Sequence, residues 1–203
     1  MKVALIGASG RIGSQILSEL HERGHDVTAI ARNPEKIAVA TGVTTVRADV
    51  ADPDGLTAAL RGHDAVISAV RFRDFDAQTL LGAVRSSGVK RLIMVGGAGS
   101  LEAKPGLALV DTPEFPEAAR PEANAGRSVL NVLRTEGSLE WTFLSPSAVI
   151  APGERTGRFR LGKDAVLIGA DGKSRISIPD YAIALVDELE HPVHIRQRFT
   201  VGY

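Results

Sequence analysis

The N-terminal stretch VALIGASGRIGSQIL, from Val3 to Leu17, constrains the fold of this chain more strongly than any other feature. A short apolar run ends at Gly7, two more glycines follow at Gly10 and Gly13, and an apolar-periodic stretch comes next. This order predicts a strand, a tight turn and a helix. Gly7 would allow the sharp turn, Gly10 would let a ligand approach backbone N–H groups, and Gly13 would let the helix pack close to the strand.

The predicted helix would offer unpaired N–H groups and the positive end of its dipole to an anion. A strand, this glycine spacing and a helix form the fingerprint of a dinucleotide site, although an ordinary glycine-rich turn can share the spacing. We interpret the turn as the site of a dinucleotide pyrophosphate. Ser9, Arg11 and Ile12 would supply further contacts from the turn.

The rest of the chain alternates short apolar runs with helix-length amphipathic segments, which predicts a doubly wound parallel α/β sheet of the Rossmann type. The runs AVISAV and RLIMV are apolar throughout, as strands are when helices cover both faces of a sheet. The predicted strands are 2–6, 26–31, 44–48, 65–69, 91–95 and 141–144, and the predicted helices are 10–23, 34–40, 53–60, 74–87 and 121–135.

The pattern changes after Pro146. Short strand-like runs joined by turns such as Asp171-Gly172 come first, then a helix that opens at Pro179 and a last strand over 196–203. We expect one domain over residues 1–203, in which residues 146–203 contribute most of a small substrate-side lobe. Segment 96–121 contains four prolines and little periodicity, which predicts a long irregular loop of the kind that often forms a lid.

The end of the second predicted strand indicates which dinucleotide binds. An enzyme that uses NAD usually has Asp or Glu there to accept a hydrogen bond from the ribose 2′-hydroxyl. This chain has Ala31 and Arg32, with no acid before Glu35. A guanidinium can hold a 2′-phosphate, which a carboxylate would repel, so we favour NADP over NAD, with Arg11 as a second cation. If Arg32 is only a solvated residue, the preference is lost but the fold is not.

The later strand ends supply the remaining candidate contacts. Asp49 and Val50 follow the third predicted strand, where a carboxylate and an apolar side chain would hold the adenine. We assign Asp52 to capping the next helix. Ala69 and Val70, at the end of the fourth strand, would line the ribose.

Composition excludes several other classes of protein. The formal net charge is zero and aromatic residues make up 4% of the chain, which argues against a nucleic-acid partner. There is no cysteine, so disulfides, thiolate metal sites and a cysteine nucleophile are excluded. His191 and His194 lack a cluster of partner ligands, so we expect a solvated loop and no metal site. The apolar runs are too short for a signal peptide or a membrane span, so we expect a cytoplasmic protein.

These motifs resemble those of the atypical short-chain dehydrogenase/reductase superfamily, and within it the NmrA-like, NAD(P)H-binding group, which includes proteins labelled NADH-flavin and biliverdin-flavin reductases. The resemblance lies in the glycine triplet, ARNPEK, Asp49-Val50 and WTFLSPSAVI, and it extends through ISIPDYAIALVDELE and RFTVGY. It implies a Rossmann fold with the substrate pocket at the carboxyl ends of the strands. It also implies that residues 145–148 lie near the nicotinamide carboxamide, and we assign Gly96 and Pro146 to positioning the nicotinamide.

One feature of the superfamily is absent. Many members use a Tyr with a Lys four positions later as proton donor, whereas neither Tyr181 nor Tyr203 is followed by that Lys. A flavin, quinone or similar conjugated ring spreads the charge of an added hydride and can take protons from solvent, so the absence favours a reductase of such acceptors. The alternative is a non-enzymatic redox sensor that binds NADP(H) and acts through a protein partner. An isomerase or epimerase would need the missing pair.

Three further features have more than one interpretation. Ser100 falls at the position of the superfamily's active-site serine and is our candidate catalytic residue, although its loop could simply leave room for substrate. Arg71 and Arg73 either contact an anionic substrate or the pyrophosphate, or form surface pairs with neighbouring acids. The acids of DELEHP, residues 187–192, are expected on a solvated helix face. We expect a small-molecule acceptor as partner, no nucleic acid and no membrane, and a homodimer as the assembly to test.

Overall fold

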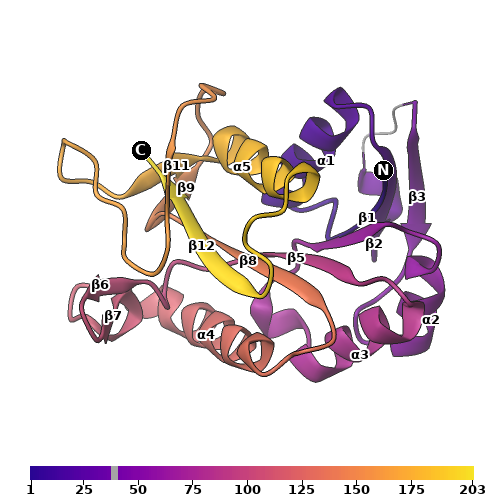
Figure 1. Cartoon of the computed structure of the whole chain (residues 1–203), viewed down its shortest axis with the longest axis horizontal. Coiled ribbons are helices and arrows are strands. Elements are labelled where there is room, and N and C mark those ends of the chain that lie inside the picture. Colours follow the sequence, from indigo (N-terminus) through magenta and orange to yellow (C-terminus); the bar gives the residue numbers. More distant parts are fainter. Residues whose placement is uncertain (38–40) are drawn as a thin grey trace.

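An eight-stranded sheet forms the centre of the computed structural model, which describes residues 1–37 and 41–203, and it confirms the predicted doubly wound α/β fold (Figure 1). The strand order is β10-β12-β8-β5-β4-β1-β2-β3. β10 pairs antiparallel with β12, and the other neighbours pair in parallel. The strands are β1 (Lys2–Ile6), β2 (Asp26–Ala31), β3 (Val43–Arg47), β4 (Ala65–Ser68), β5 (Arg91–Val95), β8 (Glu140–Pro146), β10 (Arg160–Gly162) and β12 (Gln197–Gly202).

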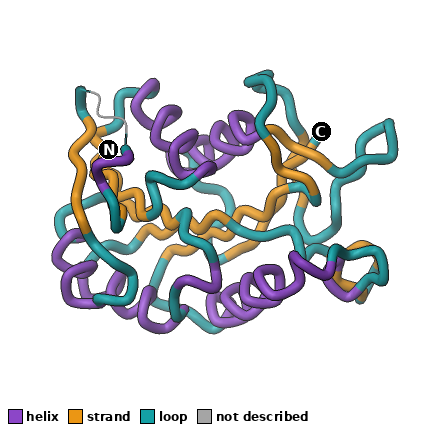
Figure 2. The backbone as a smooth tube through the Cα atoms, turned by 180° about the vertical axis from the view of Figure 1, so that it is seen from behind, coloured by secondary structure: helices purple, strands orange, loops and turns teal. Residues whose placement is uncertain are grey.

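Helices cover both faces of this sheet. Figure 2 shows the strands lying between two layers of helices. This double cover explains why every residue of β4 and β5 is buried, as their continuous apolar character predicts. One face carries α1 (Arg11–Glu22) and α5 (Ile178–Glu190), and the other carries α2 (Pro53–Leu60), α3 (Ala77–Ser87) and α4 (Arg120–Arg134).

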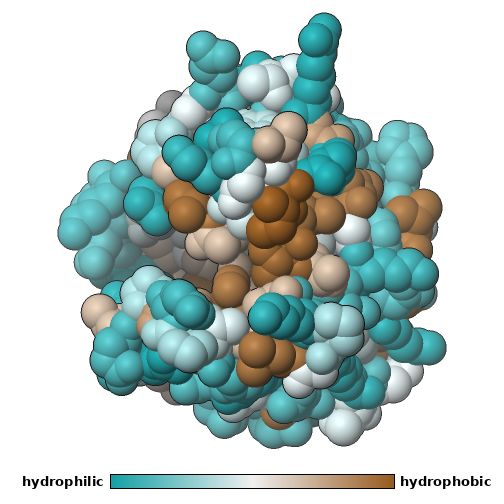
Figure 3. All heavy atoms as spheres, turned by 90° about the vertical axis from the view of Figure 1, so that its left-hand side faces the viewer, coloured by the Kyte–Doolittle hydropathy of each residue, from teal (hydrophilic) through white to brown (hydrophobic). Residues whose placement is uncertain are grey.

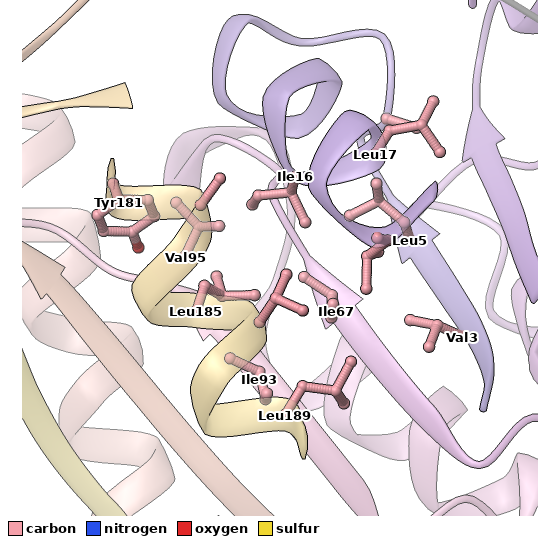
Figure 4. Packing of buried hydrophobic residues seen from close by; sticks show 14 of the residues in the cluster. Val3, Leu5, Ile16, Leu17, Ile67, Ile93, Val95, Tyr181, Leu185 and Leu189 are labelled. Atoms are coloured by element: carbon pink, nitrogen blue, oxygen red, sulfur yellow. The ribbon is translucent and has the colours of Figure 1, made fainter. Parts of the chain in front are cut away.

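The layer beneath α1 and α5 is a continuous apolar core (Figure 4). Side chains from both helices meet those of β1, β4 and β5, and burying each such aliphatic side chain contributes about 1.5–3 kcal/mol. α1 and α5 also pack against each other. The residues labelled in Figure 4 are Val3, Leu5, Ile16, Leu17, Ile67, Ile93, Val95, Tyr181, Leu185 and Leu189.

The direction in which the chain winds reverses between β1 and β4. From β1 the chain proceeds to β2 and β3 on one side, and it then returns to add β4, β5, β8 and β12 on the other side. In open α/β sheets, ligands bind in the crevice outside the carboxyl ends of the strands at this reversal point. The topology therefore places a ligand site where β1 ends at the glycine turn.

Two small sheets lie toward the same end of the molecule, at the left of Figure 1, one near α5 and the other beside α4. β9 (Val149–Ala151) pairs in parallel with β11 (Arg175–Ser177). β6 (Glu102–Lys104) and β7 (Leu107–Ala108) form an antiparallel pair. Of residues 146–203, α5 and β12 belong to the layers of the main sheet, whereas β9 and β11 stand outside it. Among the described residues, no helix combines the length and apolar character needed to cross a membrane.

Several predicted elements differ from the observed ones. The predicted helix over 34–40 is a 3₁₀ turn over Pro34–Lys36, because Ile37 is extended and its side chain is buried in the core; residues 38–40 lie outside the described part of the chain. The predicted loop over 96–121 includes the β6–β7 pair and two 3₁₀ turns, Leu109–Asp111 and Glu117–Ala119. The helix predicted from residue 74 begins at Ala77, because Asp76 caps it by accepting a hydrogen bond from the backbone N–H of Thr79.

Other local predictions are confirmed. Asp52 caps α2 by accepting a hydrogen bond from the backbone N–H of Gly55 over 3.1 Å. The predicted turn at Asp171-Gly172 forms, with Gly172 at a φ of +76°. Both predictions depend on hydrogen bonds and backbone angles within a few residues, and for that reason they can be read from the local sequence.

Candidate active site

A cleft opens at the reversal point of the sheet, outside the carboxyl ends of β1, β2 and β4. The structure brings together there most of the residues that the sequence predicts to bind a cofactor, although they come from four separate segments. The predicted residues that line the cleft are Gly7, Ser9, Gly10, Arg32, Asp49, Val50, Ala69 and Val70.

The glycine turn is shaped by contacts that exclude side chains. Gly7 has a φ of +81°, and a Cβ there would lie 2.9 Å from the backbone carbon of Ala69. A Cβ on Gly13 would lie 2.2 Å from the backbone oxygen of Gly7, so only glycine lets α1 pack this closely on the turn. The close packing of α1 on the turn is as the sequence predicts, whereas Gly13 does not line the cleft, and its part in binding a pyrophosphate stays a prediction.

The N-terminus of α1 faces this turn with its backbone donors available. Its N-cap is Gly10, which has no side chain to accept a hydrogen bond, and the first turn of the helix holds no acid. Unpaired N–H groups and the positive end of the helix dipole then favour an anion, as in dinucleotide-binding turns. The side chains of Arg11 and Ile12 do not line the cleft, so a contact between Arg11 and the cofactor stays a prediction.

Polar side chains surround the other end of the cleft, beyond β2 and β3. The Arg32 side chain is 67% exposed, and one of its nitrogens lies 4.0 Å from a carboxylate oxygen of Asp74. Asn33 and Arg71 also line this end of the cleft. The Asp49 carboxylate accepts a hydrogen bond from the backbone N–H of Ala51 over 3.0 Å, which orders it at the cleft wall.

Gly96 follows β5 directly and is positioned by contacts with β8 and α5. Its backbone N–H donates to the carbonyl of Leu144 over 2.8 Å and contacts the hydroxyl oxygen of Tyr181 at 3.3 Å. A Cβ on Gly96 would lie 2.6 Å from the carbonyl oxygen of Leu144, so glycine lets the ends of β5 and β8 come together. Pro146 ends β8 beside them. Neither Gly96 nor Pro146 lines the cleft, and their role toward a nicotinamide stays a prediction.

Tyr181 is a structural residue of the core. Its ring is fully buried, and its hydroxyl donates to the carbonyl of Leu144 over 2.7 Å. The phenol has no contact with solvent, and this burial raises the pKa of Tyr181, so the phenol stays protonated. Tyr181 is therefore unsuited to donate protons to a substrate.

Ser100 lies in a different hollow from the cleft. The walls of this hollow include Glu102, Arg127, Asp164 and Arg198, and Arg198 contacts the Ser100 hydroxyl at 3.4 Å. The structure therefore does not bring Ser100 together with the glycine turn. Its assignment as a catalytic residue stays a prediction that the arrangement of the cleft does not support.

The C-terminal acids and histidines are less exposed than the sequence suggests. Glu188 is buried, and its carboxylate accepts from Arg91 at 3.0 Å and pairs with His194 at 2.7 Å. The His194 ring also stacks on Phe199, with 4.0 Å between the ring centroids. The predictions of a solvated helix face and a solvated histidine loop hold for Asp187 and His191, which are exposed. They are wrong for Glu188 and His194, because the buried carboxylate of Glu188 binds both Arg91 and His194. No potential metal-binding cluster of His, Cys, Asp or Glu occurs in the described ranges 1–37 and 41–203.

Sequence reasoning missed several residues that line the cleft. Three of them are Ile6, Ile30 and Ala48, which lie at or next to strand ends, close in sequence to lining residues that the sequence analysis identified. Asn33 directly follows Arg32, so adjacency to a strand end was the available signal. Arg71, for which the sequence leaves a ligand contact open, also lines the cleft. Asp74 ends a 3₁₀ turn, Phe72–Asp74, that follows β4, and no local pattern reveals that it lies near Arg32.

Comparison with known proteins identifies the family. Residues 7–192 match the family described as NAD(P)H-binding. YwnB from Bacillus subtilis is 44% identical over 214 residues, which cover 99% of this chain and 98% of YwnB.

Two solved structures are similar over the whole chain. A Bacteroides thetaiotaomicron protein, provisionally named an epimerase, is 46% identical, with a TM-score of 0.95 over 100% of this chain and 96% of its own. A Streptococcus pneumoniae protein, provisionally named an NADH-flavin reductase, is 37% identical, with a TM-score of 0.85 over 100% and 99% of the two chains. Together with the cleft at the glycine turn, these matches show that the chain belongs to the NAD(P)H-binding family of Rossmann oxidoreductases, in the atypical short-chain dehydrogenase/reductase group.

Proposed function

We propose that the chain is an NADPH-dependent reductase that transfers hydride to a flavin, a quinone or a similar conjugated acceptor. The observation that most supports this proposal is the cleft itself. It joins a turn with glycine at positions 7 and 10, the N-terminus of α1, which has no side-chain cap, and the exposed guanidinium of Arg32 along one edge of the sheet. This arrangement suits the pyrophosphate and the 2′-phosphate of one dinucleotide.

The preference for NADPH depends on the end of β2. Residues 31–33 include no Asp or Glu, so this strand end lacks the carboxylate that accepts from the ribose 2′-hydroxyl in NAD enzymes. Asp74 also lines the cleft, and one of its carboxylate oxygens lies 4.0 Å from the Arg32 guanidinium. A 2′-phosphate would compete with Asp74 for Arg32 and would gain charge-assisted hydrogen bonds from it.

The choice of acceptor depends on the missing proton donor. The helix α4 carries neither a tyrosine nor a lysine, and Tyr181 is buried in the core. Reduction of a simple ketone creates an alkoxide that needs a positioned acid, whereas a conjugated ring spreads the charge. In the proposed reaction NADPH loses a hydride to the ring and becomes NADP⁺, and the ring takes a proton from solvent. The residues of this chain then act mainly by orientation and by exclusion of water.

The names of the two similar structures point in different directions. The provisional name of the Streptococcus protein supports flavin reduction, and that of the Bacteroides protein points to epimerisation. Epimerisation needs groups that remove and return a proton at the substrate carbon, and no tyrosine, histidine or lysine is among the described residues that line the cleft. Reduction therefore accounts better for the residues present.

The test is turnover of NADPH and NADH by the purified chain with a panel of flavins, quinones and small carbonyls. We expect the absorbance of the reduced nicotinamide to fall with flavins or quinones and not with simple ketones, and to fall faster with NADPH. Absence of turnover with every acceptor would refute the reductase proposal. If NADP⁺ and NADPH then bound with different affinities, the alternative of a redox sensor would replace it.

A further inference from the structure

A second cavity, of about 800 Å³, lies beside the β9–β11 pair. Its volume is in the range of small-molecule sites. Its walls combine apolar surface with positive charge: they include Val149, Ile176, Arg155, Arg158, Arg175 and Tyr203. Figure 3 views the molecule from the end that carries this pair, and it shows hydrophobic side chains gathered around a hollow with hydrophilic side chains about them.

The cavity begins where the predicted nicotinamide end of the site stops. Pro146 ends β8, and Val149 on the cavity wall begins β9 shortly after it in the chain. Tyr203 directly follows β12, in which Val201 pairs with Pro146. In the main sheet β5 and then β8 follow β4 on the side away from β1. The chain passes from the end of β8 to β9 on the wall of the cavity. A group held here would lie next to whatever occupies the carboxyl ends of β5 and β8.

The three arginines of the cavity differ in their partners. Arg155 binds the buried Glu19 on α1 through two nitrogens, at 2.9–3.1 Å, so it anchors the wall. Arg175 pairs with Asp171 at 2.6 Å, although its side chain remains 50% exposed. Among the described residues, the Arg158 guanidinium has no hydrogen-bond or ion-pair partner.

Glu154 is the one acid among the described residues of this wall, beside the three arginines. Val149, which is 57% exposed, and the ring of Tyr203 supply apolar surface beside them. Guanidinium groups recognise phosphates and carboxylates through paired hydrogen bonds, and apolar surface accommodates a ring.

We propose that this cavity binds the anionic group of the acceptor, so that the enzyme reduces phosphorylated or carboxylated ring compounds in preference to neutral ones. The inference depends on the proposed reductase function and narrows its substrate class. For flavins it states that flavin mononucleotide is a better acceptor than riboflavin, because the two share the reacting ring and differ in the phosphate. Arg158 and Arg175 are the residues that make the difference.

The experiment measures kcat/KM for flavin mononucleotide and for riboflavin, with NADPH saturating, in the full chain and in Arg158→Gln and Arg175→Gln. Arg61→Gln is the matched control, because Arg61 is an exposed arginine at the end of α2, away from the cavity. We expect wild type and the control to prefer flavin mononucleotide by roughly tenfold, and each cavity variant to lose most of this preference. The KM for NADPH and the rate with riboflavin should not change.

The outcomes separate this inference from the proposed function. Turnover of riboflavin and flavin mononucleotide at equal efficiency would overturn the inference and leave the reductase intact. A raised KM for NADPH in Arg158→Gln would overturn it as well, because the arginines would then serve the cofactor. If no acceptor of the panel were turned over, the reductase proposal would fail. Equal dissociation constants for the two flavins, measured by flavin fluorescence, would overturn the inference separately.

Discussion

Replacement of Arg32 by alanine tests whether this side chain selects the phosphorylated cofactor. The guanidinium is mostly exposed, and its one ionic contact is the 4.0 Å approach to Asp74, so the free protein should lose little stability. In the complex, the same guanidinium would donate to the 2′-phosphate. A hydrogen bond to a charged group contributes about 1.5–3 kcal/mol, and exposure of Arg32 places its effect near the lower figure.

A loss of about 1.5 kcal/mol corresponds to roughly a tenfold rise in the Kd for NADPH. The Kd for NADH should change by less than about twofold, since NADH has no phosphate there. Isothermal titration calorimetry with both cofactors measures the two changes, with Arg61→Ala as the control. Screening of exposed charges by salt should reduce the preference of wild type, with little effect on that of the variant. Equal losses for NADPH and NADH would refute the assignment of Arg32.

Three further predictions concern charged groups. Asp74→Asn should lower the Kd for NADPH by a few-fold and leave the Kd for NADH unchanged in the same titration. The substitution removes a carboxylate that would repel the 2′-phosphate. Weaker NADPH binding by the variant would contradict this prediction. Glu188→Gln should lower the free energy of unfolding by about 3–5 kcal/mol in urea, because the buried Arg91 loses its counter-ion; a loss under 1 kcal/mol, as for the exposed control Asp187→Asn, would refute it. Burial alone would raise the pKa of Glu136, but hydrogen bonds from Ser138 and Arg85 outweigh burial and hold it at about 2, below its ordinary value of 4.5. The ionised group therefore stabilises the fold above pH 4.5, and this stabilisation is lost as the pH falls toward 2. The melting temperature of Glu136→Gln, measured by thermal unfolding, should fall less than that of wild type over this pH range. Identical pH profiles of wild type and variant would contradict the prediction.

The cofactor end of the site could be predicted from the sequence because its signals are local. The apolar run of β1, the positive φ of Gly7 and the close packing at Gly13 all fall within one strand–turn–helix unit. Each of these positions constrains the backbone by itself, so neighbouring letters in the sequence suffice. Arg32 and Asp49 could be found in the same way, because they directly follow strands that the apolar pattern predicts.

The buried charge network could not be predicted, because its members are far apart in the chain. Arg91 begins β5, Glu188 lies in α5 and His194 in the connection to β12. In the sequence, Glu188 stands in a run of acids that is typical of an exposed helix face. Only the packing of α5 against the sheet shows that this one carboxylate turns inward, where Arg91 balances its charge. Periodicity alone does not distinguish it from the exposed Asp187.

The same distinction explains why the acceptor is harder to infer than the cofactor. The cavity beside β9 and β11 is assembled from residues 149–158, residues 175–177 and Tyr203, which no single motif unites. Arg155 fixes this wall to α1 through Glu19, so the position of the cavity depends on the same helix whose N-terminus faces the cleft. The cofactor end is thus specified by backbone geometry that tolerates few substitutions, whereas the free positive charge of the cavity comes from the exposed side chains of Arg158 and Arg175. We therefore expect substitutions at Arg158 and Arg175 to change which acceptor is reduced and to leave NADPH binding intact.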